Sequence, residues 1–169
     1  MASAVHVNGN KEEYLLACAR DMVDYYRAHK EEVKAQGKRI YMPNHSQHDF
    51  TPETFSTIAD ELKESLGDTK IDYFVGGIGN GSTLLGIGMR LKELYPESKI
   101  LAFEPKNACP FYVRNKEQWG KYAPQLVPSS EIPEKFTFHQ MPGTGSYGNV
   151  DFPFMDKAIA SNIIDDILP

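Results

Sequence analysis

The chain has 169 residues, of which 41% are hydrophobic, 24% charged and 11% aromatic. This composition is typical of a globular domain and excludes a disordered chain. A formal net charge of −5 argues against a protein that holds nucleic-acid phosphates along a broad basic face. No apolar run approaches the ~18 residues of a membrane span, and the first residues lack a secretory signal. We therefore expect a single cytoplasmic domain over residues 1–169, without nucleic-acid or membrane partners.

The first half of the chain predicts two helices and a strand. Apolar residues recur at spacings of three and four over residues 11–36, which predicts an amphipathic helix. A short apolar run at 40–42 indicates a strand. The Thr-Pro-Glu sequence at 51–53 is typical of a helix start, with threonine as N-cap, and the helix that it predicts ends at Gly67.

A regular alternation follows. A strand at 71–75 leads into the glycine-rich stretch 76–82, and apolar residues with helical spacing lie behind it. The run Lys99–Phe103 predicts another strand. Helix and strand in this order indicate βαβ units, so we expect an α/β fold with a mainly parallel sheet of at least three strands. Beyond Glu104, prolines and a turn-rich segment at 143–148 predict mainly loops.

The strand that delivers a glycine-rich turn into a helix is the most informative feature. Glycines allow backbone N–H groups to face inward, and the helix N-terminus adds a partial positive charge. Such a loop binds a phosphate, with Ser82 or Thr83 offering a hydroxyl group; a tight turn without a ligand is the alternative. A bulky residue at Gly81 is then expected to abolish anion binding while costing little stability, provided that the turn does not itself constrain folding.

The residues around the loop argue against two common classes of phosphate ligand, nucleoside triphosphates and dinucleotides. No lysine lies between Ile71 and Met89, so a Walker A loop is disfavoured. A dinucleotide-binding fingerprint starting at Gly77 has Ser82 at its third glycine position, and its acid, Glu104, lies further along than the expected ~20 residues.

Two histidines and an aspartate within 45–49 lack a third ligand at a defined spacing, so we expect no metal site.

Residues 74–86 read FVGGIGNGSTLLG. This segment resembles the phosphate-binding segment of fold-type II pyridoxal-phosphate enzymes, such as the cysteine synthases and the tryptophan synthase β chain, and weaker similarity extends over 11–167. The resemblance implies a three-layer αβα domain with a mainly parallel sheet, like the large domain of these enzymes but incomplete. It also implies pyridoxal 5′-phosphate as cofactor, its phosphate held by Gly79, Asn80, Gly81, Ser82 and Thr83.

One element of that family is not matched. Its Schiff-base lysine lies in a Ser-x-Lys segment upstream of the phosphate loop, and no Ser-x-Lys precedes the loop here. The resemblance therefore implies a partial enzyme of cysteine synthase-like β-replacement or elimination on an amino-acid-like substrate, inactive alone and with its catalytic residues unassigned. We expect a homodimer or a complementing chain. The alternatives are a non-catalytic binding or regulatory module on the same scaffold, and a small Rossmann-like nucleotide binder.

Overall fold

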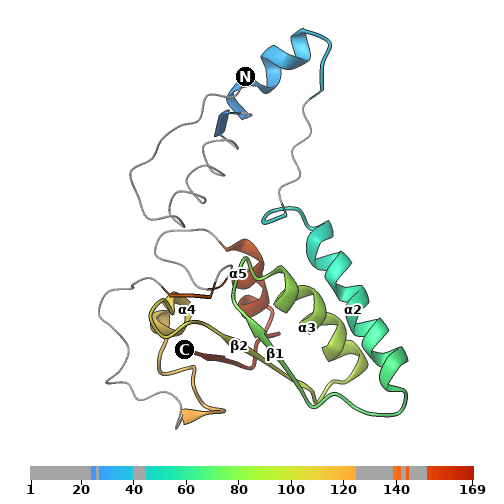
Figure 1. Ribbon diagram of the computed structural model, residues 1–169, viewed down its shortest axis with the longest axis vertical. Coiled ribbons are helices and arrows are strands. Elements are labelled where there is room, and N and C mark those ends of the chain that lie inside the picture. Colours follow the sequence, from blue (N-terminus) through green and yellow to red (C-terminus); the bar gives the residue numbers. More distant parts are fainter. Residues whose placement is uncertain (1–23, 26, 40–44, 125–138, 142–143, 145–151) are drawn as a thin grey trace. The chain divides into compact units, whose positions relative to one another are not determined.

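The computed structural model describes residues 24–25, 27–39, 45–124, 139–141, 144 and 152–169 (Figure 1). The chain divides into two compact units, Met1–Asn44 and His45–Pro169. In the first unit, residues 24, 25 and 27–35 are helical, and Gly37 follows with a φ of +72°. The described part of the helix predicted over 11–36 is therefore confirmed. The strand predicted at 40–42 lies outside the described residues.

The second unit is an α/β domain built on a parallel sheet. Its sheet has the strand order β1-β2-β3, and both strand pairs are parallel. The carboxyl ends of the described strands therefore meet at one edge, as in the predicted fold class. The elements, in chain order, are α2 (Phe50–Leu66), β1 (Tyr73–Gly77), α3 (Ser82–Leu94), β2 (Lys99–Phe103), α4 (Pro110–Arg114), α5 (Pro153–Ala160) and β3 (Asp166–Leu168).

The bounds of α2 and β1, and the presence of α4 and α5, differ from the sequence predictions. Helix α2 begins at Phe50 with Asp49 as N-cap, so the prediction of Thr51 as N-cap is wrong. The Thr51 N–H already donates to the His48 carbonyl over 2.9 Å, which places Thr51 inside the first turn. Strand β1 begins two residues later than predicted. Helices α4 and α5 lie where mainly loops were predicted, and both have proline at their start.

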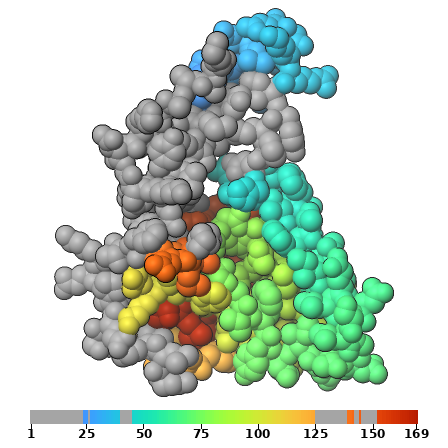
Figure 2. Space-filling view, viewed as in Figure 1, coloured from blue at the N-terminus to red at the C-terminus, as the bar shows by residue number. Residues whose placement is uncertain are grey.

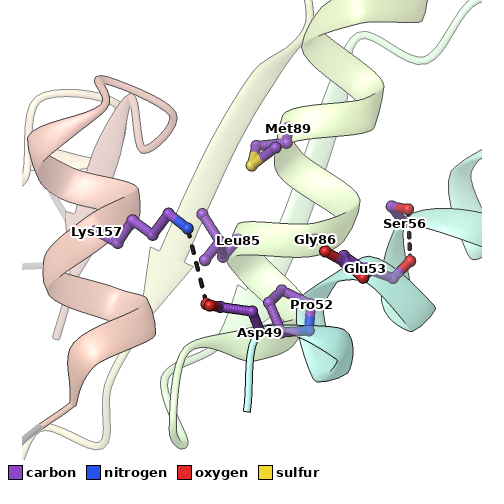
Figure 3. Close-up of a pocket in the computed structure, with 8 residues that line it drawn as sticks. All are labelled: Asp49, Pro52, Glu53, Ser56, Leu85, Gly86, Met89 and Lys157. Atoms are coloured by element: carbon purple, nitrogen blue, oxygen red, sulfur yellow. Dashed lines mark hydrogen bonds and ion pairs between the residues drawn. The ribbon is translucent and has the colours of Figure 1, made fainter. Parts of the chain in front are cut away.

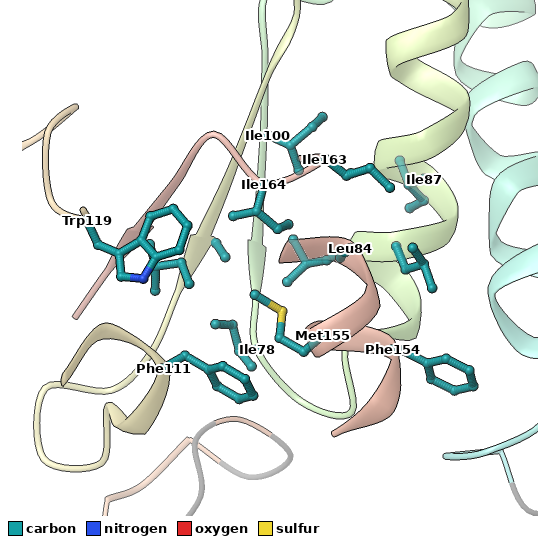
Figure 4. Packing of buried hydrophobic residues seen from close by; sticks show 14 of the residues in the cluster. Ile78, Leu84, Ile87, Ile100, Phe111, Trp119, Phe154, Met155, Ile163 and Ile164 are labelled. Carbon is teal, nitrogen blue, oxygen red and sulfur yellow. The ribbon is translucent and has the colours of Figure 1, made fainter. Parts of the chain in front are cut away.

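The core lies between α3 and the sheet, and α5 closes it (Figure 4). Leu84 of α3, Met155 of α5 and Ile100 of β2 are fully buried in one cluster. Burying such a side chain contributes about 1.5–3 kcal/mol to the free energy of unfolding. Phe111, Tyr112 and Trp119, which follow β2, join the same cluster. The core therefore fixes α3, and with it the glycine-rich loop, against the sheet.

Two glycines in α3 allow this close packing. A Cβ at Gly86 would fall on the backbone carbonyl oxygen of Pro52 in α2, whereas a Cβ at Gly88 would lie 2.7 Å from the Ile163 Cγ2 atom. Figure 1 shows α2 and α3 side by side along their length. Because Gly86 has no side chain, the α3 backbone approaches α2 directly.

Strand β3 is tied to the segment that follows α4 by one buried carboxylate. The Asp166 side chain is fully buried and accepts hydrogen bonds from the N–H groups of Gly120 (2.6 Å), Tyr122 (2.7 Å) and Ile167 (2.9 Å). Trp119, next to Gly120, is 8% exposed. A charge in this position is stabilised only through its donors, so Asp166 holds residues 119–123 against β3.

Candidate functional site

The glycine-rich loop leaves β1 at the carboxyl edge of the sheet. The Ile78 N–H donates to the Phe103 carbonyl over 2.9 Å, which ties the start of the loop to the end of β2. Gly81 is the N-cap of α3 and has a φ of +87°. Residues with a side chain rarely adopt this left-handed conformation. The positive φ therefore falls on a glycine, and Ser82 begins the helix.

The expectation that Gly81 tolerates a bulky residue at little cost in stability is wrong. A Cβ at Gly81 would fall on the backbone nitrogen of Met155 and lie 2.7 Å from its Cα atom. Any side chain would therefore displace α5 as well as strain the Gly81 backbone. Substitutions at Gly81 cannot separate anion binding from stability.

Thr144 lies close to Gly77 at the start of the glycine-rich stretch. A Cβ at Gly77 would lie 2.9 Å from the Thr144 Cγ2 atom, so the absence of a side chain at Gly77 makes room for Thr144. Figure 2 shows the described residues 139–141 and 144 as an orange patch beside the green surface of the second unit. Gly77 and Thr144, far apart in sequence, therefore lie next to each other at the end of β1.

The loop presents a set of donors suited to an anion. Among the residues that the structure describes, the backbone N–H groups of Gly79, Gly81 and Thr83 have no hydrogen-bond acceptor. The half-buried Thr83 hydroxyl likewise has no partner in the described part of the chain. These donors lie at the N-terminus of α3, where the helix dipole favours negative charge. Their chemistry fits a phosphate group.

Asn80 and Ser82, two of the five predicted phosphate ligands, are bonded to each other. The Asn80 Oδ1 atom accepts the Ser82 N–H over 3.0 Å and the Ser82 hydroxyl over 2.7 Å. The Asn80 Nδ2 atom donates to the His45 carbonyl over 3.3 Å. The predicted residues therefore lie together, but the Ser82 N–H and hydroxyl are bonded to Asn80 and are not available to a phosphate. An asparagine two residues before a backbone N–H is the sequence signal for such a contact.

Glu104, the acid that follows β2, is engaged in the fold. It is 2% exposed, and its carboxylate accepts the N–H groups of Phe111 over 3.2 Å and Tyr112 over 2.8 Å at the start of α4. Burial raises the pKa of Glu104 to about 7. These contacts do not support the role of ribose-binding acid that a dinucleotide fingerprint would require.

The raised pKa of Glu104 should make the free energy of unfolding depend on pH. Because its pKa is about 7 in the folded chain and about 4.5 in the unfolded chain, the folded state binds the proton more tightly. We expect the free energy of unfolding to fall by about 2 kcal/mol between pH 5 and pH 8 on this account. In Glu104→Gln this contribution is absent. Urea unfolding of both proteins across this range measures the difference, and equal pH slopes would contradict the assignment.

A pocket of about 280 Å³ is lined by residues of α2, α3 and α5 (Figure 3). Lys157 of α5 reaches across Leu85 towards Asp49, and their charged atoms are 3.9 Å apart. This pocket was not predictable from the sequence, because its lining residues come from three separate helices. The lining residues are Asp49, Pro52, Glu53, Ser56, Leu85, Gly86, Met89 and Lys157.

Metal-binding side chains, membrane-crossing helices and cysteines are the other features that bear on function. No group of three or more His, Cys, Asp or Glu side chains there could hold a metal ion. Within the same residues, no helix is long and apolar enough to cross a membrane. The Cys109 thiol is buried, and burial raises its pKa to about 11. This cysteine is therefore not an activated nucleophile.

Comparison with known proteins identifies the family. A sequence profile described as "Pyridoxal-phosphate dependent enzyme" matches residues 4–156. Cystathionine β-synthase of Apis mellifera is 34% identical over 96 residues, which are 57% of this chain and 15% of that protein. Cysteine synthase of Staphylococcus aureus is 36% identical over 67 residues, or 39% of this chain and 22% of the enzyme. The matched regions thus span less than a quarter of these relatives.

The fold is shared with solved structures. The crystal structure of a hydrogen sulfide-producing enzyme from Fusobacterium nucleatum is similar with a TM-score of 0.55 and 24% sequence identity. The similarity covers 90% of this chain and 40% of that one. The α/β class, the parallel sheet and the resemblance noted in the sequence are therefore confirmed, and the described helices are consistent with a three-layer arrangement. The chain belongs to the family of pyridoxal-phosphate-dependent enzymes.

Proposed function

We propose that this chain provides the phosphate-binding part of a cytoplasmic pyridoxal-phosphate-dependent enzyme of amino-acid metabolism. The observation that carries the proposal is the set of backbone donors of Gly79, Gly81 and Thr83, which lie at the N-terminus of α3 without acceptors among the described residues. A phosphate needs several such donors on one side. The family membership indicates which phosphate compound fills the site.

The residues of the loop have distinct roles in this proposal. The N–H groups of Gly79 and Gly81 bind phosphate oxygens, and Thr83 adds its N–H and its hydroxyl. When bound, pyridoxal phosphate supplies an electron sink for chemistry at the amino acid's α carbon. Because the relatives include a cysteine synthase and a cystathionine β-synthase, we propose β-replacement or elimination on a serine- or cysteine-like substrate. The loop holds the phosphate and leaves covalent attachment to a lysine outside it.

Phosphate binding is tested with Thr83→Val. This change removes one hydroxyl donor, so we expect pyridoxal phosphate and inorganic phosphate to bind about fivefold more weakly, as the loss of ~1 kcal/mol implies. Calorimetry and the ligand-induced rise in Tm measure the affinity. Thr57→Val is the matched control, because the Thr57 hydroxyl donates to Thr54 within α2.

The wild-type protein provides the ligand controls for this test. Pyridoxal, which lacks the phosphate, is expected to leave the Tm unchanged, whereas both phosphate ligands raise it. Absence of any rise with either ligand at millimolar concentration would reject the phosphate site. An equal effect of both threonine variants would reject the role of Thr83.

A non-catalytic binding module on the same scaffold is the second candidate. It is favoured by one observation: the N–H and the hydroxyl of Ser82, a predicted phosphate ligand, are both bonded to Asn80. Borohydride reduction in the presence of pyridoxal phosphate, followed by peptide mapping, distinguishes the two. Stoichiometric labelling of one lysine in this chain would establish a covalent site and reject the module. If the lysine belongs to a second chain, sedimentation should detect a homodimer or a complex with a complementing chain.

A further inference from the structure

We propose that the Asn80 side chain competes with the bound phosphate and sets the affinity of the loop for it. This inference rests on the proposed function, because it concerns the same five residues. Asn80 Oδ1 accepts two donors of Ser82, its backbone N–H over 3.0 Å and its hydroxyl over 2.7 Å. The first backbone N–H group of α3, that of Ser82, is therefore already bonded to an oxygen of the protein itself.

An anion would need the same donor. The first backbone N–H groups of a helix have no partner within the helix and are those that bind an anion. In α3 the first is that of Ser82, and a phosphate oxygen bonded to it would occupy the place of Asn80 Oδ1. The Ser82 side chain is 2% exposed, so it cannot turn its donors to solvent. Full engagement of a phosphate thus requires the Asn80 side chain to leave.

A second contact opposes that movement. Asn80 Nδ2 donates to the His45 carbonyl over 3.3 Å, so the carboxamide is held at both its oxygen and its nitrogen. Phosphate binding therefore breaks bonds to Ser82 and to His45, and the cost lowers the affinity for the anion. Asn80 does not have a positive φ, so alanine is compatible with the backbone at this position.

Two substitutions distinguish an Asn80 side chain that competes with phosphate from one that helps to bind it. Asn80→Ala removes the competing oxygen, and we expect inorganic phosphate and pyridoxal phosphate to bind about fivefold to tenfold more tightly, as one or two released hydrogen bonds imply. Asn80→Asp keeps an acceptor for Ser82 and adds a negative charge, so binding should become at least about tenfold weaker. The control is Asn115→Ala, because the Asn115 amide donates to Gln118 in the turn after α4.

Isothermal titration calorimetry with each ligand gives the affinities, and the Tm with and without phosphate gives an independent readout. Without ligand, Asn80→Ala should have a lower Tm than the wild type, because Ser82 loses its acceptor; saturating phosphate should reduce this difference. Equal or weaker binding by Asn80→Ala, with binding by the wild type intact, would overturn the inference alone. Absence of binding in the wild type would overturn the proposed function and the inference together.

Discussion

Gly86→Ala is expected to destabilise the protein by about 3 kcal/mol, although alanine is the better helix former. The added Cβ would fall on the Pro52 carbonyl oxygen, which belongs to the backbone and cannot rotate away. Helix α2 must therefore shift along its contact with α3. For a chain of this size the loss corresponds to a fall in Tm of roughly 6–12 °C. Thermal and urea unfolding measure it.

The matched control is Gly88→Ala, which adds the same methyl group to the same helix. Its Cβ would meet the Ile163 Cγ2 atom at 2.7 Å, and a side-chain methyl group can move where a backbone oxygen cannot. We expect a loss no greater than about 1 kcal/mol, since improved helix propensity offsets part of the crowding. A larger loss for Gly88→Ala than for Gly86→Ala would contradict the direct backbone approach of α2 and α3.

Asp166→Asn should lower the free energy of unfolding by about 3–5 kcal/mol. The fully buried carboxylate accepts hydrogen bonds from three backbone N–H groups. In the asparagine variant an NH₂ group replaces one oxygen, so at least one backbone N–H would lie against another donor and lose its hydrogen bond. Residues 119–123 should then separate from β3. Trp119 is the single tryptophan of the chain and is buried, so its fluorescence should shift to longer wavelength.

Asp156→Asn is the control for the loss of a charge. Asp156 pairs with Arg114 over 3.2 Å, and both side chains are more than half exposed. Such pairs contribute little to stability, so the unfolding midpoint and the Trp119 emission should stay near those of the wild type. Unchanged emission in Asp166→Asn, or equal destabilisation by both variants, would show that the Asp166 contacts do not hold residues 119–123.

The elements that the sequence predicted well depend on local patterns. Strand β2 has the predicted bounds, and α3 follows the glycine-rich turn as expected. Both follow from local patterns, a short apolar run in β2 and a glycine-rich turn before α3. Helix α5 was missed because it has only eight residues and owes its position to Phe154 and Met155, which are buried against α3 and the sheet. The role of Asp166 was not predictable from the sequence, because two of its three backbone donors, Gly120 and Tyr122, lie more than 40 positions earlier in the chain.

The candidate site divides in the same way. The glycine-rich loop was predicted from a local motif and its five phosphate-binding residues from the family resemblance, and the structure brings these residues together at the start of α3. The contact of Gly81 with the Met155 backbone was not predictable, because 74 positions separate the two residues and α5 itself was not foreseen. The Asn80–Ser82 bonds were within reach of a local argument, since asparagine commonly accepts an N–H two residues later. The pocket beside Lys157 required the packing of three helices.

The strand order has a kinetic consequence. Strands β1 and β2 are joined through α3 by a short connection, whereas β3 begins at Asp166, far along the chain from the end of β2 at Phe103. Closing the longer loop costs more chain entropy before any contact compensates for it. We therefore expect the β1–α3–β2 unit to form early in folding and β3 to join it late. The burial of Trp119, which depends on Asp166, would then report the final step of folding rather than the first.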